Sequence, residues 1–534
     1  MHLGRIALFA LACSTASVAA PPVDPATLGR ISDEAFNHSE VAQTAAYLTD
    51  RIGGRLTNSP AMRTAEGWTQ DRFRQWGLAN VHKEGFEFGR GWWAEYAAVR
   101  MTAPRPLMLR AIATAWTPAT AGTISAPIIV APMRRERDFE AWRGKLAGKI
   151  VLFTYPADPK DATEPAFRRQ DEASLKKLDT YRQPSFDPGA IDRLVRQRRF
   201  NAALDAFAKA EGAVALVRMA PRDNGLLAGQ GTGFEVGKTP ALPAVELAAE
   251  DYRRLARLAK TGPVTIEIES RAHFEDADTK AYNVFADIPG SDPKAGYVMA
   301  GAHLDSWVAA DGAADNGAGS AMIMEAARIL ARLGVKPKRT IRFALWAGEE
   351  QGLMGSTAFV DQHLARRAPD SDPARAALGS YRNPTFPITP LPGFKDLVAY
   401  FNIDNGSGKL RGLYAEGNYG VVPIFKDWLA PFASMGANTV VAQPTGSTDH
   451  VAMQRLGLPA FQFIQDPLDY GSTVHHSSVD TFDHLRIEDL REGAVVLATM
   501  LLDAANADQP LPRLPLPTQP TPSDPFHYDD PDEG

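Results

Sequence analysis

Cysteine and long hydrophobic runs are almost absent from this chain. A single cysteine, Cys13, occurs among its 534 residues. One cysteine cannot form an internal disulfide, and if the chain is cleaved after Ala20 the mature protein has no cysteine at all, so a bound metal would be held by nitrogen and oxygen ligands. No apolar segment approaches the roughly 20 residues that a membrane-spanning helix requires. The sequence therefore excludes a disulfide-stabilised scaffold and predicts no transmembrane segment.

An excess of charge of one sign is also missing. The net charge is -6, and charged residues make up 22% of the chain beside 45% hydrophobic residues. A nucleic-acid-binding protein normally carries a marked positive patch, so nucleic acid is not expected as a partner. The composition is that of a folded globular protein, and the length predicts two or three domains.

The N-terminal stretch "MHLGRIALFALACSTASVAAPP" has the three parts of an export signal. Arg5 precedes an apolar run from Ile6 to Ala12, and small residues then lead to Ala20. This order is typical of a secretory signal peptide that is cleaved after a small residue. We therefore expect a periplasmic or secreted protein. The alternative is a lipoprotein anchored through Cys13, although Ala10 stands where such signals usually have leucine.

Changes in local amino-acid composition divide the chain into blocks. Helical patterns fill the first block, short apolar runs cut by glycine and proline fill the second, and strands alternate with helices in the third. The end of the chain is proline-rich and acidic, which is typical of disorder. The predicted organisation is a signal peptide (1–20), the N-terminal part of a catalytic domain (21–120), an inserted β-rich domain (121–270), the main catalytic domain (271–508) and a disordered tail (509–534).

The third block predicts the fold class. Its runs "YVMAGAH", "TIRFALWA", "LVAYFNID" and "PAFQFI" are almost continuously apolar, as strands buried on both faces are. Helical segments such as "SAMIMEAARILARLG" separate them. This alternation predicts a three-layer α/β sandwich around a mixed, mostly parallel sheet.

Polar residues follow the carboxyl ends of these strands, where open α/β sheets place their sites. Several acids would face one another there, and burying unpaired carboxylates is costly unless a cation neutralises them. The candidates are His303, Asp305, Asp315, Glu349, Glu350, Asp404, His475, His476 and Asp480. Histidine nitrogen with carboxylate oxygen suits catalytic zinc. The number of candidates exceeds the needs of one tetrahedral ion and fits two zinc ions that share a carboxylate.

The series "HLDS…ADNGAG…WAGEEQGLMGS…NIDNG…HHSSVDT", in this order, resembles the M28 family of co-catalytic zinc peptidases. The resemblance implies a zinc aminopeptidase-like fold. It also implies that Asp315 bridges two zinc ions, that Glu350 and His476 complete one site, and that His303 and Asp404 complete the other.

The same resemblance assigns roles to residues beside the ligands. Glu349 matches the general base, which takes a proton from the water between the metals and passes it to the leaving amine. Asp305 matches the residue that orients the His303 ring. His475 occupies a slot that often holds a tyrosine, which donates a hydrogen bond to the tetrahedral intermediate. The family often has a cis peptide after the bridging aspartate, so we expect one at Asp315–Asn316.

The second block, with "LAGKIVLF…KAEGAVALV…PALPAVEL…PVTIEIE", resembles the protease-associated domain that is inserted in some M28 peptidases. The basic stretch "RLVRQRRF" (Arg193–Phe200) departs from that pattern and reads as an insertion in it. The motifs "GAHLDSW" and "HHSSVDT" are most similar to the carboxypeptidase Q branch of the family, whose substrates are dipeptides and short peptides.

The sequence thus predicts a metallo-exopeptidase whose partners are peptides, with a homodimer left open beside a monomer. One alternative is a dizinc aminopeptidase that acts on longer peptides. A non-catalytic, receptor-like protein on the same fold is another, but it would be expected to have lost ligands or the base. A single-zinc acyltransferase similar to glutaminyl cyclases is the third.

Overall fold

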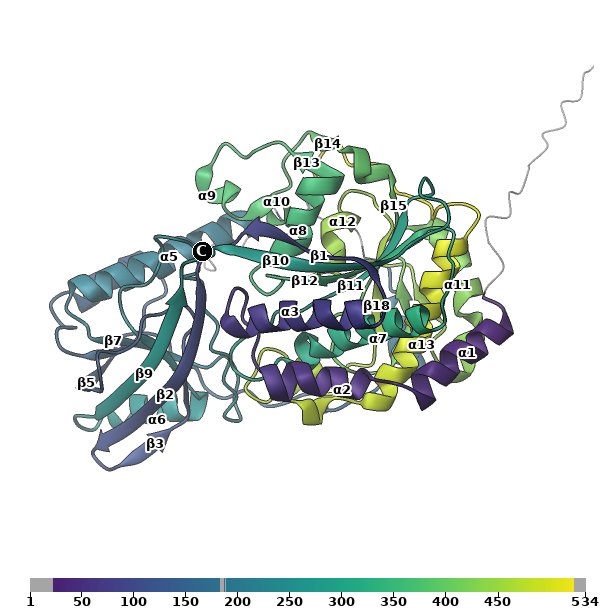
Figure 1. Ribbon diagram of the computed structural model, residues 1–534. Helices are drawn as coiled ribbons and strands as arrows, with labels where there is room; N and C mark the ends of the chain where they lie inside the picture. The colour runs from purple at the N-terminus through teal and green to yellow at the C-terminus, as the bar shows by residue number, and fades with distance from the viewer. Residues whose placement is uncertain (1–22, 183–186, 188, 523–534) are drawn as a thin grey trace, which may run out of the picture.

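The computed structural model describes residues 23–182, 187 and 189–522, and there the chain forms two large sheets with helices packed against them (Figure 1). The predicted signal peptide (1–20), with Cys13, lies outside the described residues. Among the helices of the described part, none is both long and apolar enough to cross a membrane.

The first sheet has eight strands in the order β1-β10-β12-β11-β15-β18-β16-β17. Its centre is parallel, because β12, β11, β15 and β18 run in one direction, whereas β10 at one side and β16 at the other are antiparallel to their central neighbours. The strands are β1 (Ala79–Glu87), β10 (Lys280–Ile288), β11 (Tyr297–His303), β12 (Thr340–Trp346), β15 (Leu397–Asn402), β16 (Leu410–Tyr414), β17 (Thr439–Val441) and β18 (Ala460–Gln465).

Side chains of the central strands point alternately into two cores. On β11, Val298 and Ala300 belong to the larger core, whereas Met299 between them belongs to the core on the opposite face. Helices cover both faces (Figure 1). In that view α1 (Pro25–Asn37), α2 (Val41–Ala46), α3 (Pro60–Gln75), α7 (Ala318–Arg332) and α13 (Ile487–Asn506) lie below the sheet, and α8 (Met354–Phe359), α10 (Gly379–Arg382) and α12 (His450–Gln454) lie above it. The predicted three-layer α/β sandwich around a mixed sheet is confirmed.

The second sheet, also of eight strands, has the order β3-β2-β9-β5-β6-β7-β8-β4. Helices α5 (Gly189–Ala210) and α6 (Ala249–Leu258) supply side chains to its two cores. The strands are β2 (Gly91–Ala103), β3 (Leu107–Leu109), β4 (Ala111–Ala113), β5 (Ile124–Val130), β6 (Ile150–Leu152), β7 (Ala215–Met219), β8 (Ala244–Leu247) and β9 (Thr265–Glu275).

The second sheet begins at Gly91. The change in local composition predicted the start of the inserted domain later, near residue 121. Strand β2 pairs with β9 from Gly91↔Glu275 to Ala103↔Thr265, so the two strands form one long ribbon. Residues 92–103 of β2 contain no glycine or proline, whereas the second block is recognised by short apolar runs cut by these residues, so composition does not assign β2 to that block.

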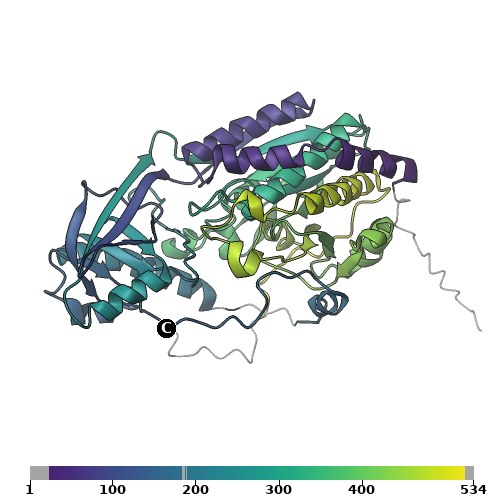
Figure 2. The same cartoon turned by 90° about the horizontal axis from the view of Figure 1, so that it is seen from below.

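The segment after β6 leaves the second sheet and lies on the first (Figure 2). Within it, Leu175 of α4 (Glu172–Leu178) packs with Val441 and Ile464 of the first sheet. Arg169 pairs with Asp466 at 2.9 Å. The basic stretch (Arg193–Phe200), read from the sequence as an insertion, lies within α5, the helix by which the chain returns to the second sheet.

The proline-rich end of the chain differs from the expected disordered tail as far as residue 522. Residues 509–522 form no helix or strand, but Leu511 is buried. The Arg513 guanidinium donates hydrogen bonds to the carbonyls of Phe394 and Leu397, at 2.8 and 2.7 Å. Proline lowers the conformational entropy of a chain segment before it is ordered. Less entropy is then lost when the segment packs on the surface without forming a helix or strand. Residues 523–534 lie outside the described residues.

Candidate metal centre

The candidate ligands meet at one edge of the first sheet because its central strands are parallel. Strand β11 ends at His303, β12 ends shortly before Glu349 and Glu350, and β15 ends two residues before Asp404. His475 and His476 follow β18 in a loop. Parallel strands that end together bring side chains from distant sequence positions to one place.

Asp315 lies between the two histidines expected to bind different metals. Its Oδ1 atom is 3.2 Å from Nε2 of His303, and its Oδ2 atom is 3.2 Å from Nε2 of His476. One carboxylate therefore faces both imidazoles with different oxygens, which is the arrangement that a bridging ligand needs.

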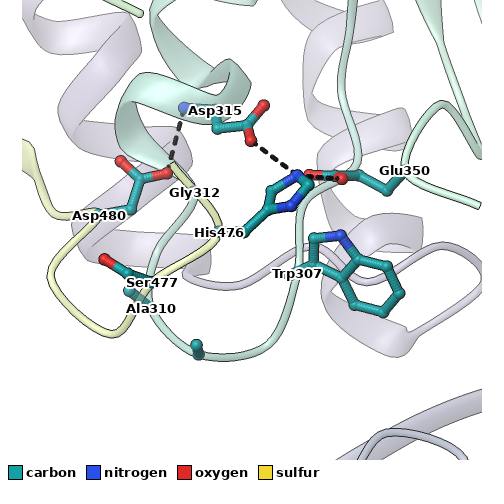
Figure 3. A pocket seen from close by; sticks show the side chains of 9 residues that line it. Trp307, Ala310, Gly312, Asp315, Glu350, His476, Ser477 and Asp480 are labelled. Carbon is teal, nitrogen blue, oxygen red and sulfur yellow. Dashed lines mark hydrogen bonds and ion pairs between the residues drawn. The ribbon is translucent and has the colours of Figure 1, made fainter. Parts of the chain in front are cut away.

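On one side of Asp315 the structure brings His476 and Glu350 together. Nε2 of His476 is 2.7 Å from Oε2 of Glu350 (Figure 3). The indole of Trp307 lies beside this histidine, with the ring centroids 6.3 Å apart. On the other side, Nε2 of His303 is 3.3 Å from Oδ1 of Asp404. The same nitrogen is 4.0 Å from Oε2 of Glu349, so the expected base lies next to this second group.

The acids at the centre strongly perturb one another. Burial raises the pKa of Glu349 well above its usual value, and the carboxylates of Asp404 and Glu350 raise it further. Burial, with the nearby charge of Asp315, raises the pKa of Glu350 to about 7. Burial alone would lower the pKa of His303, but the carboxylates around it, Asp404 first, raise that pKa well above the ordinary value. The site is a buried concentration of negative charge.

The chemistry of this donor set fits metal ions. Among the described residues, Oδ2 of Asp315 and Oε1 of Glu350 are buried side-chain atoms that receive no hydrogen bond. Buried acceptors without donors are costly, and a cation satisfies them. Three overlapping groups have ligand atoms within 4.8 Å of one another: Asp315 with His475 and His476, His303 with Asp315 and Glu350, and His303 with Glu349 and Asp404. The overlap at His303 and Asp315 agrees with a centre larger than a single tetrahedral site.

A family model described as Peptidase family M28 matches residues 283–501, the range that holds all the candidate ligands. We call this stretch, which is similar to the M28 peptidases, the M28 domain. The match confirms the resemblance predicted from the motifs and the expectation that the chain is a peptidase.

Proteins similar to this chain extend the likeness beyond the M28 domain. Carboxypeptidase Q of Mus musculus is 25% identical over 510 residues, which are 92% of this chain and 94% of that protein. The crystal structure of a peptidase M28 precursor from Shewanella amazonensis is 23% identical and has a TM-score of 0.63, over 92% of this chain and 99% of that one. A zinc aminopeptidase from Bacillus subtilis, 19% identical, has a TM-score of 0.54 over 87% of this chain and 94% of that one. The two solved structures share the fold.

Within the M28 domain, Asp305 was expected to orient the His303 ring, and it contacts that ring through its backbone rather than its carboxylate. The backbone carbonyl of Asp305 is 2.9 Å from Nδ1 of His303, whereas its carboxylate is 3.7 Å from that nitrogen. The carboxylate instead accepts hydrogen bonds from the backbone N–H groups of Glu349 and Glu350, at 3.2 and 3.4 Å. It thus holds the turn that carries the base. Because a carbonyl can only accept, Nδ1 of His303 carries the proton and Nε2 is left to bind a metal.

The loop that carries Asp315 is held from outside the M28 domain. The guanidinium of Arg55, which is fully buried, donates hydrogen bonds to the carbonyls of Leu304 and Gly312, at 2.8 and 2.7 Å. The structure also has the expected cis peptide bond at Asp315–Asn316.

His475 lies at the edge of the centre rather than inside it. Its side chain is 43% exposed, and Nε2 is 3.6 Å from Oδ2 of Asp315. Its ring is stacked on that of His476, with the centroids 3.7 Å apart. Burial lowers the pKa of His475, and so the imidazole is neutral at neutral pH and carries one N–H.

Three polar residues near the centre were not among the sequence candidates. Thr57 donates a hydrogen bond of 2.8 Å to Oδ2 of Asp305. The side-chain amide of Gln230, from the region of the second sheet, is 2.8 Å from Nδ1 of His476. Asp449 is completely buried, and burial raises its pKa to about 7. The adjacent acid and histidine in "STDH" were the only sequence signal for Asp449, and the other two residues gave none.

The centre opens into a large cavity. Asp315, Glu349, Asp404 and His475 all line it, and its volume is about 1120 Å³. Ligand pockets of small molecules commonly span about 300–1,000 Å³, so a short peptide fits in this space.

Proposed function

We propose that this chain is an exported dizinc exopeptidase that hydrolyses dipeptides or short peptides in the manner of carboxypeptidase Q. The observation that carries the proposal is Asp315, whose two oxygens each lie 3.2 Å from a different histidine. A ligand so placed serves two metals at once, which is the requirement of a co-catalytic centre.

In this proposal the five ligands divide as the family resemblance implies. His303 and Asp404 would hold one zinc ion, His476 and Glu350 the other, and Asp315 both. When bound, the ions would supply a nucleophilic water at neutral pH and a positive charge that polarises the scissile carbonyl. Asp305 and Gln230 would hold the ligands in position, as partners behind a metal's own ligands generally do.

Glu349 is proposed as the general base and acid. Its buried carboxylate, with a raised pKa, is a stronger base than a solvated one and is suited to take a proton from the attacking water. As the water oxygen bonds to the carbonyl carbon and the C–N bond breaks, the proton passes from Glu349 to the leaving amine. His475 would donate the N–H of its imidazole to the oxyanion, and its position 3.6 Å from Oδ2 of Asp315 supports this role.

The second sheet is proposed to be the protease-associated domain suggested by the sequence. In support, its region reaches the centre through Gln230, beside His476. Such a domain would form one wall of the substrate cavity and restrict the size of the peptides admitted.

Export is the part of the proposal that rests on the N-terminal sequence. Cleavage after Ala20 would give a mature chain without cysteine. Mass spectrometry of the N-terminus of the protein from its native host tests this step. Pro21 as the first residue supports release by signal peptidase, whereas an acylated Cys13 would show a lipoprotein.

The experiment that tests the activity uses a panel of dipeptides with free or blocked ends. We expect the zinc-loaded protein to release amino acids from free dipeptides, a chelator to stop the reaction and added zinc to restore it. Glu349→Gln should retain metal but lose about 10²–10⁴-fold in rate, the usual contribution of a general base. Preference for long peptides with a free amino end would favour the aminopeptidase alternative. Absence of hydrolysis by the fully loaded protein would favour a receptor-like role.

A further inference from the structure

Three arginines line the substrate cavity together with the acids of the metal centre. They are Arg367, Arg382 and Arg455, and the same cavity is lined by Asp315, Glu349 and Asp404. The cavity therefore contains acids, which suit metal ions, and also positive groups that these ions do not require. A positive group in a substrate cavity indicates a negative group on the substrate.

Arg382 lies against the turn that carries the expected base. It ends α10, and its guanidinium lies against Gly352, where a Cβ atom would be only 2.6 Å from Nη2. Gly352 closes the turn that carries the base, since its N–H donates a hydrogen bond of 2.7 Å to the carbonyl of Glu349. Gly352 has φ of +120°, a conformation that residues with a side chain rarely adopt. The glycine thus admits the guanidinium to the side of the turn that faces the cavity.

The other two arginines, Arg367 and Arg455, lie close to each other in the cavity wall. Burial lowers the pKa of Arg367, and the charge of Arg455 lowers it further, which shows that the two guanidinium groups are close to each other. Asp361 is the acid that acts on Arg367 in the opposite direction. Asp187 also lines the cavity, and its carboxylate forms an ion pair with Arg193.

The chemistry of peptide cleavage links Glu349 to a carboxylate on the substrate. The base returns its proton to the leaving nitrogen, so the leaving residue lies on the side of Glu349. In a dipeptide the free carboxylate of that residue is only two bonds from the same nitrogen. When the leaving nitrogen is within reach of Glu349, the carboxylate must therefore also lie close to Glu349. Arg382 packs against the turn that carries this base.

We propose that Arg382 is a specificity-determining residue that binds the free C-terminal carboxylate of the substrate, with Arg367 and Arg455 adding positive charge behind it. This inference rests on the proposed function and deepens it, because it selects carboxypeptidase action on dipeptides over aminopeptidase action on long chains. Guanidinium is well suited to the task, since its planar N–H groups match the two oxygens of a carboxylate.

The test compares three substrates that all release free alanine. They are alanyl-leucine, alanyl-leucinamide and alanyl-glutamic acid α-amide, whose only carboxylate belongs to the glutamate side chain. We expect Arg382→Gln to lower kcat/KM for alanyl-leucine about 10- to 100-fold, the loss typical of a hydrogen bond to a charged group. Hydrolysis of alanyl-leucinamide should hardly change, so the ratio of acid to amide should collapse, and Arg382→Lys should restore part of it.

Arg366→Gln is the matched control, because Arg366 is exposed and does not line the cavity. It should behave like the wild type. An equal loss on acid and amide in Arg382→Gln would assign a structural role and overturn the proposal. A selective loss on the glutamic acid α-amide would overturn it too, since the carboxylate bound would then belong to a side chain. If the wild type released no alanine from any substrate, the proposed function itself would fail, which is a distinguishable result.

Discussion

The carboxylate of Asp480 holds the backbone of Asp315 in place. It accepts a hydrogen bond of 3.1 Å from the N–H of Asp315 (Figure 3) and another of 2.6 Å from the N–H of Ala314. Burial and the nearby charge of Asp315 raise the pKa of Asp480 to about 8, and the two N–H groups oppose that shift. Asp480 therefore acts on the metal centre through the loop, as a positioning residue that is not itself a ligand.

We predict that Asp480→Asn weakens zinc binding about 10- to 100-fold, the usual cost of changing a partner behind a metal ligand. An amide can present only one acceptor oxygen to the two N–H groups, so the loop should lose one of its two anchors. Competition with a zinc chelator measures the change. Asp483→Asn, on an exposed neighbour, is the control and should bind zinc as the wild type does. Unchanged affinity in Asp480→Asn would contradict the prediction.

Removal of individual ligands should distinguish the bridging carboxylate from the others. Asp315→Ala should lose both zinc ions, because its two oxygens face both histidines. Asp404→Ala should weaken chiefly one ion, since Asp404 approaches only His303 of these two histidines. Metal analysis after dialysis gives the stoichiometry. Equal and full zinc content in the two variants would show that Asp315 does not bridge.

His475→Phe should lower kcat and kcat/KM together while zinc content and KM are retained. The reason is that a donor to the oxyanion acts in the transition state, where such a group contributes about 2.7–4 kcal/mol. Steady-state kinetics with metal analysis of the same preparation are needed, because His475 also lies 3.6 Å from Asp315. A variant that loses zinc but has normal kcat per bound ion would assign His475 to the metal instead.

Asp503 should make the folded state less stable at alkaline pH. Burial raises its pKa to about 7, above the value of about 3.9 in an unfolded chain. Between these values the unfolded state releases a proton that the folded state retains, so the free energy of unfolding falls as pH rises from about 4 to 7.

Asp503→Asn removes this titration and keeps an oxygen for the N–H of Val23, which lies 2.7 Å from Oδ1 of Asp503. We expect the variant to be more stable than the wild type at pH 8, by about 1–3 kcal/mol, the cost of a buried unsatisfied group. Near pH 4 the difference should shrink. Thermal unfolding at both pH values measures it, with exposed Asp508→Asn as the control. A difference that is larger at acid pH would refute the assignment.

The strand ends were predictable from the sequence because two signals coincided there. Apolar runs such as that of β11 marked strands buried on both faces, and a polar residue such as His303 at the end of each run marked the edge where they meet. Thr57 and Gln230 lie in loops, where neither a hydrophobic period nor a motif marks a single polar side chain. Their proximity to Asp305 and His476 depends on how segments distant in the sequence pack together. A pattern within one short segment does not predict such packing.

The contacts of Arg55 and Gln230 show which residues a shortened, catalytically competent protein would have to include. Both residues lie outside the M28 domain, yet Arg55 holds the Asp315 loop and Gln230 lies against His476. A truncated protein limited to residues 283–501 would contain every proposed ligand and lack these supports. Grafting, circular permutation or split-enzyme designs must therefore carry residues from before β10 and from the second sheet's region, because the pocket is assembled from segments that a cut at the family boundary would separate.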